Sequence, residues 1–204
     1  YRGTASGGET LLTTLGAVTS WTDSGLTNGT TYYYKVTALN SVGESGLSNE
    51  RSATPTAAPT APGAPTLNSA TAGSTTITLS WSAPTSDGGS AITNYRIYRG
   101  TASGGETLLA TLGNVTSFGD SGLTNGTTYY YVVAAVNGVG QGASSNERSA
   151  TPATLPGAPA LNSATPGNGS VALAWTGPAS NGGSAVTGYK VYRGTASGAE
   201  TFLT

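Results

Sequence analysis

The sequence predicts an all-β protein built from repeated β-sandwich modules. Short stretches such as Thr76–Trp81 and Asn94–Arg99 alternate apolar and polar residues, which is the period of a half-buried strand. Segments rich in Gly, Ser and Asn separate these stretches at a spacing of roughly 8–12 residues, typical of a sandwich or a barrel. No segment keeps a helical apolar period over the roughly 11–18 residues that identify a helix. We therefore expect strands and turns throughout the chain.

An internal repeat organises the chain. Residues 1–55 recur at 98–152, beginning with the identical run YRGTASGGETLL, and most of the remaining positions also match. A second, weaker match relates residues 62–104 to residues 156–198. The two overlapping matches define one repeating unit of about 95 residues.

The repeat frame predicts one complete module between two complementary partial modules. Residues 56–152 form the complete module, residues 1–55 the C-terminal part of another, and residues 153–204 the N-terminal part of a third. Each part alone would leave an apolar sheet face and open strand edges uncovered. Two interpretations remain open: the parts continue into a longer covalent array, or the front part of one copy packs head to tail on the back part of the next.

The complete module resembles a fibronectin type III domain of the kind found in secreted and surface bacterial proteins. In that family's lettering, residues 1–55 would hold strands C′, E, F and G, and residues 153–204 strands A, B, C and C′. The resemblance covers the whole chain and implies an immunoglobulin-like β-sandwich for each module. It rests on five segments of the complete module: Pro62–Pro65, Trp81, the Tyr95–Ile97 pair, Leu123–Tyr129 and Ser145–Pro152.

Strand alternation and the resemblance together predict the structural core. These side chains would interdigitate between two sheets about 10 Å apart. The Tyr129 hydroxyl would bond to nearby backbone, as in a tyrosine corner. The predicted core residues are Trp81, Tyr95, Ile97, Leu123, Tyr129, Tyr131 and Val133 in the complete module, and Leu26, Tyr32, Tyr34, Trp175 and Tyr189 in the partial ones.

Composition excludes several classes of chemistry. The chain has no His, Cys or Met, so His-dependent triads, thiol nucleophiles, disulfides and the usual zinc and haem ligands cannot be built. Eight Lys and Arg residues against nine Asp and Glu give a net charge of −1, which offers no basic surface for nucleic acid. Most carboxylates recur with the repeat, as Glu9 and Glu106 do, which favours turns and surface pairs over a glycosidase pair. We expect no enzyme activity, cofactor, metal site or membrane insertion, and we expect Asp87-Gly-Gly to form a turn rather than a calcium loop.

The strongest remaining candidate for recognition is an aromatic and basic sheet surface. Strand parity places its members on the outward face of two adjacent strands, where they could stack sugar rings or contact another module. Ordinary cross-strand packing on a solvated sheet is the other interpretation. The candidate platform consists of Arg96, Tyr98, Tyr130 and Val132, with Tyr33, Lys35, Lys190 and Tyr192 as counterparts in the partial modules.

The resemblance implies a non-catalytic extracellular or cell-surface structural repeat. It would act as a stalk, spacer or fibre-forming array of a large protein, with neighbouring copies of the repeat as its partners. Two alternatives remain: a spacer in a secreted polysaccharide-degrading enzyme, or a weak carbohydrate-binding module that uses the Tyr/Arg face. The partners would then include polysaccharides or glycans, but neither nucleic acid nor a membrane.

Overall fold

The computed structural model describes residues 1–204, and all its regular elements are β-strands. The chain divides into two compact units, Tyr1–Ala58 and Pro59–Thr204, which are described separately below. The module limits at residues 55/56 and 152/153 stay a prediction. No helix in the structure has the length and apolar character needed to cross a membrane.

The complete sandwich occupies the first part of the second unit. In its smaller sheet, the alternation of the central strand buries Ile77, Leu79 and Trp81 and leaves the residues between them more exposed. All pairs are antiparallel, in the order β4-β5-β8. The strands are β4 (Thr66–Ala72), β5 (Thr76–Ser82) and β8 (Ser117–Ser121).

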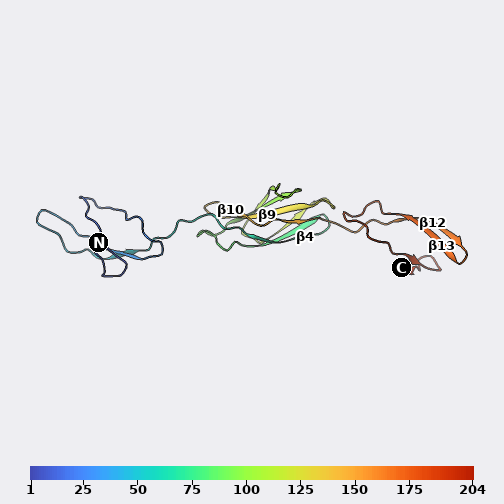
Figure 1. The fold of residues 1–204 in the computed structure, drawn as a ribbon, viewed down its shortest axis with the longest axis horizontal. Coiled ribbons are helices and arrows are strands. Elements are labelled where there is room, and N and C mark those ends of the chain that lie inside the picture. Colours follow the sequence, from blue (N-terminus) through green and yellow to red (C-terminus); the bar gives the residue numbers. More distant parts are fainter. The chain divides into compact units, whose positions relative to one another are not determined.

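The larger sheet supplies the opposite layer. Its order is β10-β9-β6-β7, and β11 pairs with one end of β9; Figure 1 labels β9 and β4, one strand from each layer. The long β9 is rich in aromatic and β-branched residues, which suit a central strand. The strands are β6 (Asn94–Gly100), β7 (Thr107–Leu112), β9 (Tyr129–Val136), β10 (Gln141–Ser144) and β11 (Arg148–Ala150).

The core lies between these two sheets. Trp81 of β5 meets Tyr95 of β6 with ring centroids 5.5 Å apart and planes tilted by 58°, a separation that favours an aromatic pair. The Trp81 Nε1 and the Tyr95 hydroxyl are buried without a hydrogen-bond partner, so apolar packing has to outweigh their desolvation. The cluster of buried residues is Leu67, Ile77, Leu79, Trp81, Tyr95, Ile97, Leu123, Tyr129, Tyr131, Val133 and Ala135.

One amide holds the start of the module against a loop. The buried Asn137 side chain donates to the carbonyl oxygens of Thr60 (2.7 Å) and Asp87 (2.8 Å). Gly88 follows with φ of 74°, and a Cβ there would overlap the Thr60 carbonyl oxygen. Only glycine fits both this left-handed conformation and this close approach. The Asp87-Gly-Gly segment is thus a turn that clamps the preceding linker.

The first unit forms a small antiparallel sheet of order β1-β2-β3. Tyr32 is buried, and Leu26 and Tyr34 are half-buried. The Tyr32 hydroxyl accepts the N–H of Thr27 at 3.1 Å, in the same manner as Tyr129 accepts that of Thr124. The strands are β1 (Arg2–Gly3), β2 (Tyr32–Tyr34) and β3 (Arg51–Ala53).

The last part of the second unit contains two hairpins whose apolar side chains stay exposed. Trp175 packs edge-on against Tyr189 at 5.6 Å, yet the two residues are 39% and 44% exposed. Their counterparts Trp81 and Tyr95 are covered by a facing sheet, whereas β12 and β13 form a two-stranded sheet of their own. The strands are β12 (Ala160–Gly167), β13 (Ser170–Thr176), β14 (Tyr192–Arg193) and β15 (Thr201–Phe202), with β12 and β13 seen in orange in Figure 1.

Candidate functional site

The outward face of the larger sheet carries the predicted platform of the complete module. The register places Tyr98 opposite Val132 and Tyr130 opposite Gly100 on the paired strands β6 and β9. Arg96, Tyr98, Tyr130 and Val132 are all half-buried, which means that their side chains lie partly against the sheet. The side chains of the platform are therefore partly covered and do not project freely into the solvent.

Gln141 organises one side of this platform. Its Oε1 accepts a hydrogen bond from Arg96 Nη1 at 2.9 Å and another from the Tyr98 hydroxyl at 2.8 Å. Gln141 begins β10, which follows β9 across a sharp turn. Sequence reasoning missed Gln141 because its position beside Arg96 depends on the pairing of β10 with β9.

The counterparts of the platform in the partial modules have different surroundings. Tyr33 lies in β2 opposite Gly3, and Lys35 follows the same strand. In the last part of the chain, Tyr192 is exposed and stacks edge-on with Phe202 at 5.9 Å, and the Lys190 ammonium lies 5.9 Å from the same ring.

A charged cluster sits beside Tyr33 in the first unit. The Lys35 ammonium lies 3.0 Å from Glu9 Oε2 and 3.2 Å from Glu50 Oε2. Ser6 Oγ and the N–H of Gly7 donate to the Glu50 carboxylate at 2.8 and 3.0 Å. The pKa of Glu50 is lowered from 4.5 to about 2. Side-chain hydrogen bonding with Glu9 is the largest cause, followed by the hydrogen bonds from Ser6 and Gly7. The same carboxylates raise the pKa of Lys35.

We expect the first unit to lose stability as the pH falls from about 5 towards 2. The unfolded chain takes up a proton on Glu50 near its ordinary pKa of 4.5, whereas the folded unit resists until about 2, so acid favours unfolding within this window. The urea midpoint of the first unit, followed through the NMR signals of Tyr32–Tyr34, should decrease over this range. Glu50→Gln should flatten the decrease, and an unchanged pH profile in that variant would contradict the assignment.

The complete module repeats this cluster without its lysine. Glu147 receives hydrogen bonds from Ser103 Oγ and the N–H of Gly104, each at 3.0 Å, as Glu50 does in the first unit. The pKa of Glu147 is lowered, first by side-chain hydrogen bonding with Glu106 and then by the hydrogen bond from the Gly104 N–H. Val132 stands where the first unit has Lys35. The two carboxylates therefore lie together with no ammonium between them.

A second charged cluster connects the two layers of the sandwich. The buried Asp120 of β8 is paired with Arg99 Nη1 at 2.9 Å and accepts the Tyr131 hydroxyl at 2.8 Å. Burial, and then the hydrogen bond to Asp120, raise the pKa of Tyr131. The Arg99 guanidinium also lies 5.6 Å from the centre of the Tyr129 ring. The side chains of Arg99 and Tyr131 both pair with the carboxylate of Asp120. The cluster therefore links β6, β8 and β9.

The first unit contains the same tie. Arg2 Nη1 lies 3.0 Å from Asp23 Oδ2, and the Tyr34 hydroxyl donates to the same oxygen at 3.0 Å. The pKa of Tyr34 is raised, first by burial and then by the hydrogen bond to Asp23. Strand alternation alone assigned Tyr34 and Tyr131 to the core without indicating their polar partner. The signal that was available is the recurrence of Arg, Asp and Tyr at equal spacing in both repeats.

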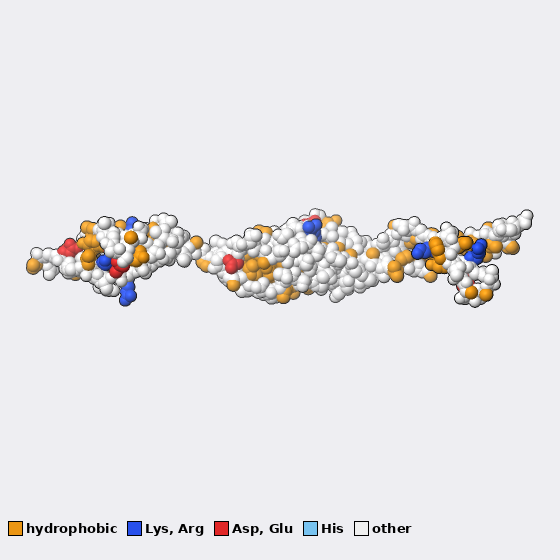
Figure 2. Space-filling model, turned by 90° about the horizontal axis from the view of Figure 1, so that it is seen from below, with side chains coloured by type: hydrophobic (Ala, Val, Ile, Leu, Met, Phe, Trp, Pro, Cys, Tyr) orange, Lys and Arg blue, Asp and Glu red, His pale blue; other side chains and the backbone are white.

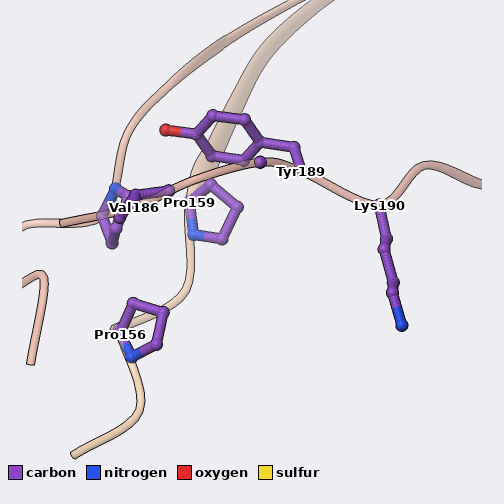
Figure 3. Close-up of a pocket in the computed structure, with 8 residues that line it drawn as sticks. Pro156, Pro159, Val186, Tyr189 and Lys190 are labelled. Carbon is purple, nitrogen blue, oxygen red and sulfur yellow. The ribbon is translucent and has the colours of Figure 1, made fainter. Parts of the chain in front are cut away.

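A shallow cavity of about 190 Å³ lies at the start of the last part of the chain. Figure 3 shows the Tyr189 ring beside Pro159, with Val186 and Pro156 nearby and the Lys190 side chain directed away from them. The cavity is smaller than the roughly 300–1,000 Å³ of ordinary ligand sites. Its lining comes from the segments that precede β12 and follow β13, and the three prolines, Val186 and the Tyr189 ring make it apolar.

The remaining surface is mostly neutral. Figure 2 shows only scattered Lys, Arg, Asp and Glu side chains on the visible face, in agreement with a charged fraction of 8%. No group of three or more Asp or Glu side chains is placed to hold a metal ion by itself. Neutral polar groups and short apolar patches dominate what the chain offers to a partner.

Comparisons with known proteins agree with this architecture. Residues 60–151 match the family model described as the fibronectin type III domain. The chain is 36% identical over 191 residues to exoglucanase B of Cellulomonas fimi, an alignment that covers 86% of the chain and 17% of that protein. It is 39% identical over 139 residues to chitinase A1 of Niallia circulans, with 65% and 19% covered. The chain thus spans less than a fifth of the length of either relative.

A solved structure is similar as well. The crystal structure of an Fn3-like protein from Clostridium thermocellum is 33% identical, covers 47% of this chain and 98% of its own, and gives a TM-score of 0.38. The sandwich described above, the family match and the sequence relatives support one assignment. Residues 60–151 of the chain belong to the fibronectin type III family.

Proposed function

We propose that this chain is a non-catalytic extracellular structural repeat, acting as a stalk, spacer or fibre-forming segment of a larger secreted or cell-surface protein. The observation that carries the proposal is the complete sandwich, which folds around its own core without disulfides and is held at its start by Asn137. The short segment 151–156 that follows it contains two prolines, which restrict bending between successive repeats. A row of such modules would hold the parts of a larger protein at a fixed distance and would carry out no reaction.

The parent protein is proposed to be a polysaccharide-degrading enzyme or a surface array. Relatives named as an exoglucanase and a chitinase contain segments similar to this one over a minor part of their length, which supports the spacer role. The Tyr98 and Arg96 surface supports a second candidate, weak glycan binding. Retention of the chain on insoluble cellulose or chitin separates this second candidate from a pure spacer.

The proposed partners are neighbouring copies of the repeat. In the complete module, the counterparts of Leu161 and Trp175 are covered by the opposite sheet. Residues 1–55 carry nearly the same sequence as the segment that supplies much of that cover. The exposed side of β12 and β13 therefore fits the C-terminal part of another repeat, the part that residues 1–55 represent. The contact is the same whether that repeat is covalently attached or belongs to a second copy.

Sedimentation velocity of the full chain over a range of concentrations tests this pairing. We expect larger, head-to-tail species to grow with concentration, because a heterologous contact propagates. Trp175→Asp should suppress the growth by placing a charge on the exposed side of β13, whereas Tyr98→Ala on the platform should leave it intact. A chain that stays monomeric at every concentration, or growth that persists in Trp175→Asp, contradicts pairing through this face.

A further inference from the structure

We propose that Asn168 is a site of spontaneous deamidation, where the asparagine is converted to aspartate and isoaspartate through a cyclic imide formed with Gly169. This inference is independent of the structural role proposed above. It rests on a comparison of five Asn-Gly pairs that share one local sequence and differ in their tertiary surroundings. The pairs begin at Asn28, Asn125, Asn137, Asn168 and Asn181.

The reaction needs only the asparagine, the backbone nitrogen that follows it, and water. The glycine nitrogen loses its proton and attacks the side-chain carbonyl carbon, so that a C–N bond forms and ammonia leaves. Water then opens the ring at either carbonyl and gives a carboxylate on a normal or an isomerised main chain. The sum is amide plus water to carboxylic acid plus ammonia, with no oxidation or reduction. Glycine favours the attack because no side chain obstructs its nitrogen and its backbone is conformationally free.

The turn at Asn168 leaves both reacting groups free. Asn168 and Gly169 form the two-residue tip of the β12–β13 hairpin, between the paired residues Gly167 and Ser170. Asn168 is exposed, and the N–H of Gly169 makes no hydrogen bond to the backbone. Gly169 has a φ of 66°, and a Cβ placed there would meet nothing within 4 Å. No other part of the chain therefore restrains the tip.

Two of the other pairs have their attacking nitrogen occupied. The N–H of Gly29 donates to the Pro55 carbonyl oxygen, and that of Gly126 donates to the Pro152 carbonyl oxygen, each at 2.8 Å. The nitrogen reacts only after this hydrogen bond has opened, and such local openings are rare in a folded domain. We therefore expect Asn28 to be protected in its folded unit.

The remaining two pairs are also restrained. Asn137 is buried, and its side-chain amide donates to the Thr60 carbonyl oxygen at 2.7 Å, so its carbonyl carbon cannot turn towards the next nitrogen. At Asn181 the N–H of the following Gly182 donates to Ser180 Oγ at 3.2 Å. Asn168 is thus the pair with neither restraint.

The complete module contains the equivalent hairpin tip in a covered form. Ser74 and Thr75 occupy the places of Asn168 and Gly169 in the repeat. The N–H of Thr75 donates to Asn125 Oδ1 at 2.8 Å, whereas the N–H of Gly169 has no such acceptor. The two tips therefore compare one turn with and without a partner for its second N–H.

Deamidation changes a hairpin that has no charge of its own. The segment from Ala160 to Thr176 contains no Lys, Arg, Asp or Glu. The product exposes a carboxylate at the tip, and its isomerised form adds a carbon atom to the main chain of a two-residue turn. The modification thus gives a neutral hairpin a negative charge.

The test is incubation of the folded full chain in mildly alkaline buffer, at a concentration where it sediments as a monomer. Tandem mass spectrometry of its peptides then locates the products. We expect Asn168 to react at least about tenfold faster than the other four asparagines, because a protected nitrogen reacts only from opened states. In water labelled with heavy oxygen, the product should contain one labelled atom. In concentrated urea the five rates should become similar, because the local sequence is shared.

Two variants complete the test. Asn168→Ser, which copies the complete module at this position, should abolish the product. Ser74→Asn combined with Thr75→Gly places an Asn-Gly pair in the covered tip, and glycine suits residue 75 because its φ is 55°. This pair should react at least about tenfold more slowly than Asn168. Equal rates at Asn168 and the other natural pairs in the folded chain, or an equally fast reaction at the introduced pair, overturn the proposal.

Discussion

Trp81→Ala is expected to destabilise the complete module by about 3–5 kcal/mol, enough to unfold a marginal domain. The indole is 3% exposed and packs on Tyr95 between the two sheets, so its removal opens a cavity that the surrounding strands cannot close. Urea denaturation, with the amide exchange of Tyr129–Val136 as a readout specific to this module, measures the loss.

The chain contains a matched control for this substitution. Trp175 occupies the equivalent place in the repeat but is 39% exposed and contacts one aromatic ring. Trp175→Ala should therefore cost about 1 kcal/mol or less at concentrations where the chain is monomeric. Equal losses in the two variants would contradict the view that the facing sheet, rather than the hairpin itself, stabilises the tryptophan.

Asp120→Ala is the second substitution with a large expected effect, about 2–3 kcal/mol on the same module. It leaves the Tyr131 hydroxyl and the Arg99 guanidinium without their partner in the interior. Breaking a buried charge pair usually costs about 3–5 kcal/mol. The expected loss is smaller because Arg99 is 32% exposed and water can solvate part of its charge.

A double-mutant cycle with Tyr131→Phe separates the two contacts of Asp120. The phenylalanine variant loses only the hydroxyl and should cost about 1 kcal/mol, and the cycle then isolates the hydrogen bond to the carboxylate. Asp23→Ala, at the equivalent position of the first unit, should leave the complete module unchanged. A loss below about 0.5 kcal/mol in Asp120→Ala would show that the tie contributes little.

The local pattern predicted most of the sandwich because strand parity is a property of neighbouring residues. The alternation around Trp81 and around Tyr95 indicated which side of each strand is apolar, and the all-β class follows from it. The fibronectin type III assignment rests instead on the resemblance of particular segments and on the match of residues 60–151. The turn at Gly88 could be predicted in the same way, because glycine favours the left-handed backbone conformation that this turn requires.

The polar contacts could not be predicted in the same way. Gln141 meets Arg96 and Tyr98, and Glu147 meets Glu106, only because strands distant in the sequence are paired in one register. The alternation placed Tyr131 inside, but its partner Asp120 comes from the opposite sheet. The first contacts depend on which distant strands pair within one sheet, and the last depends on how two sheets are placed face to face. A short stretch of sequence specifies neither.

The sequence by itself determined the strand class, the repeat frame and the absence of histidine and thiol chemistry, because these depend on residue type and spacing alone. Tertiary structure decided which copy of a repeated residue is buried and which is open. Trp81 and Trp175 occupy the same position of the repeat, each two residues after a leucine, yet one is enclosed and the other exposed. The physical reason is that burial is a property of two facing sheets, and a strand carries only one side of that contact.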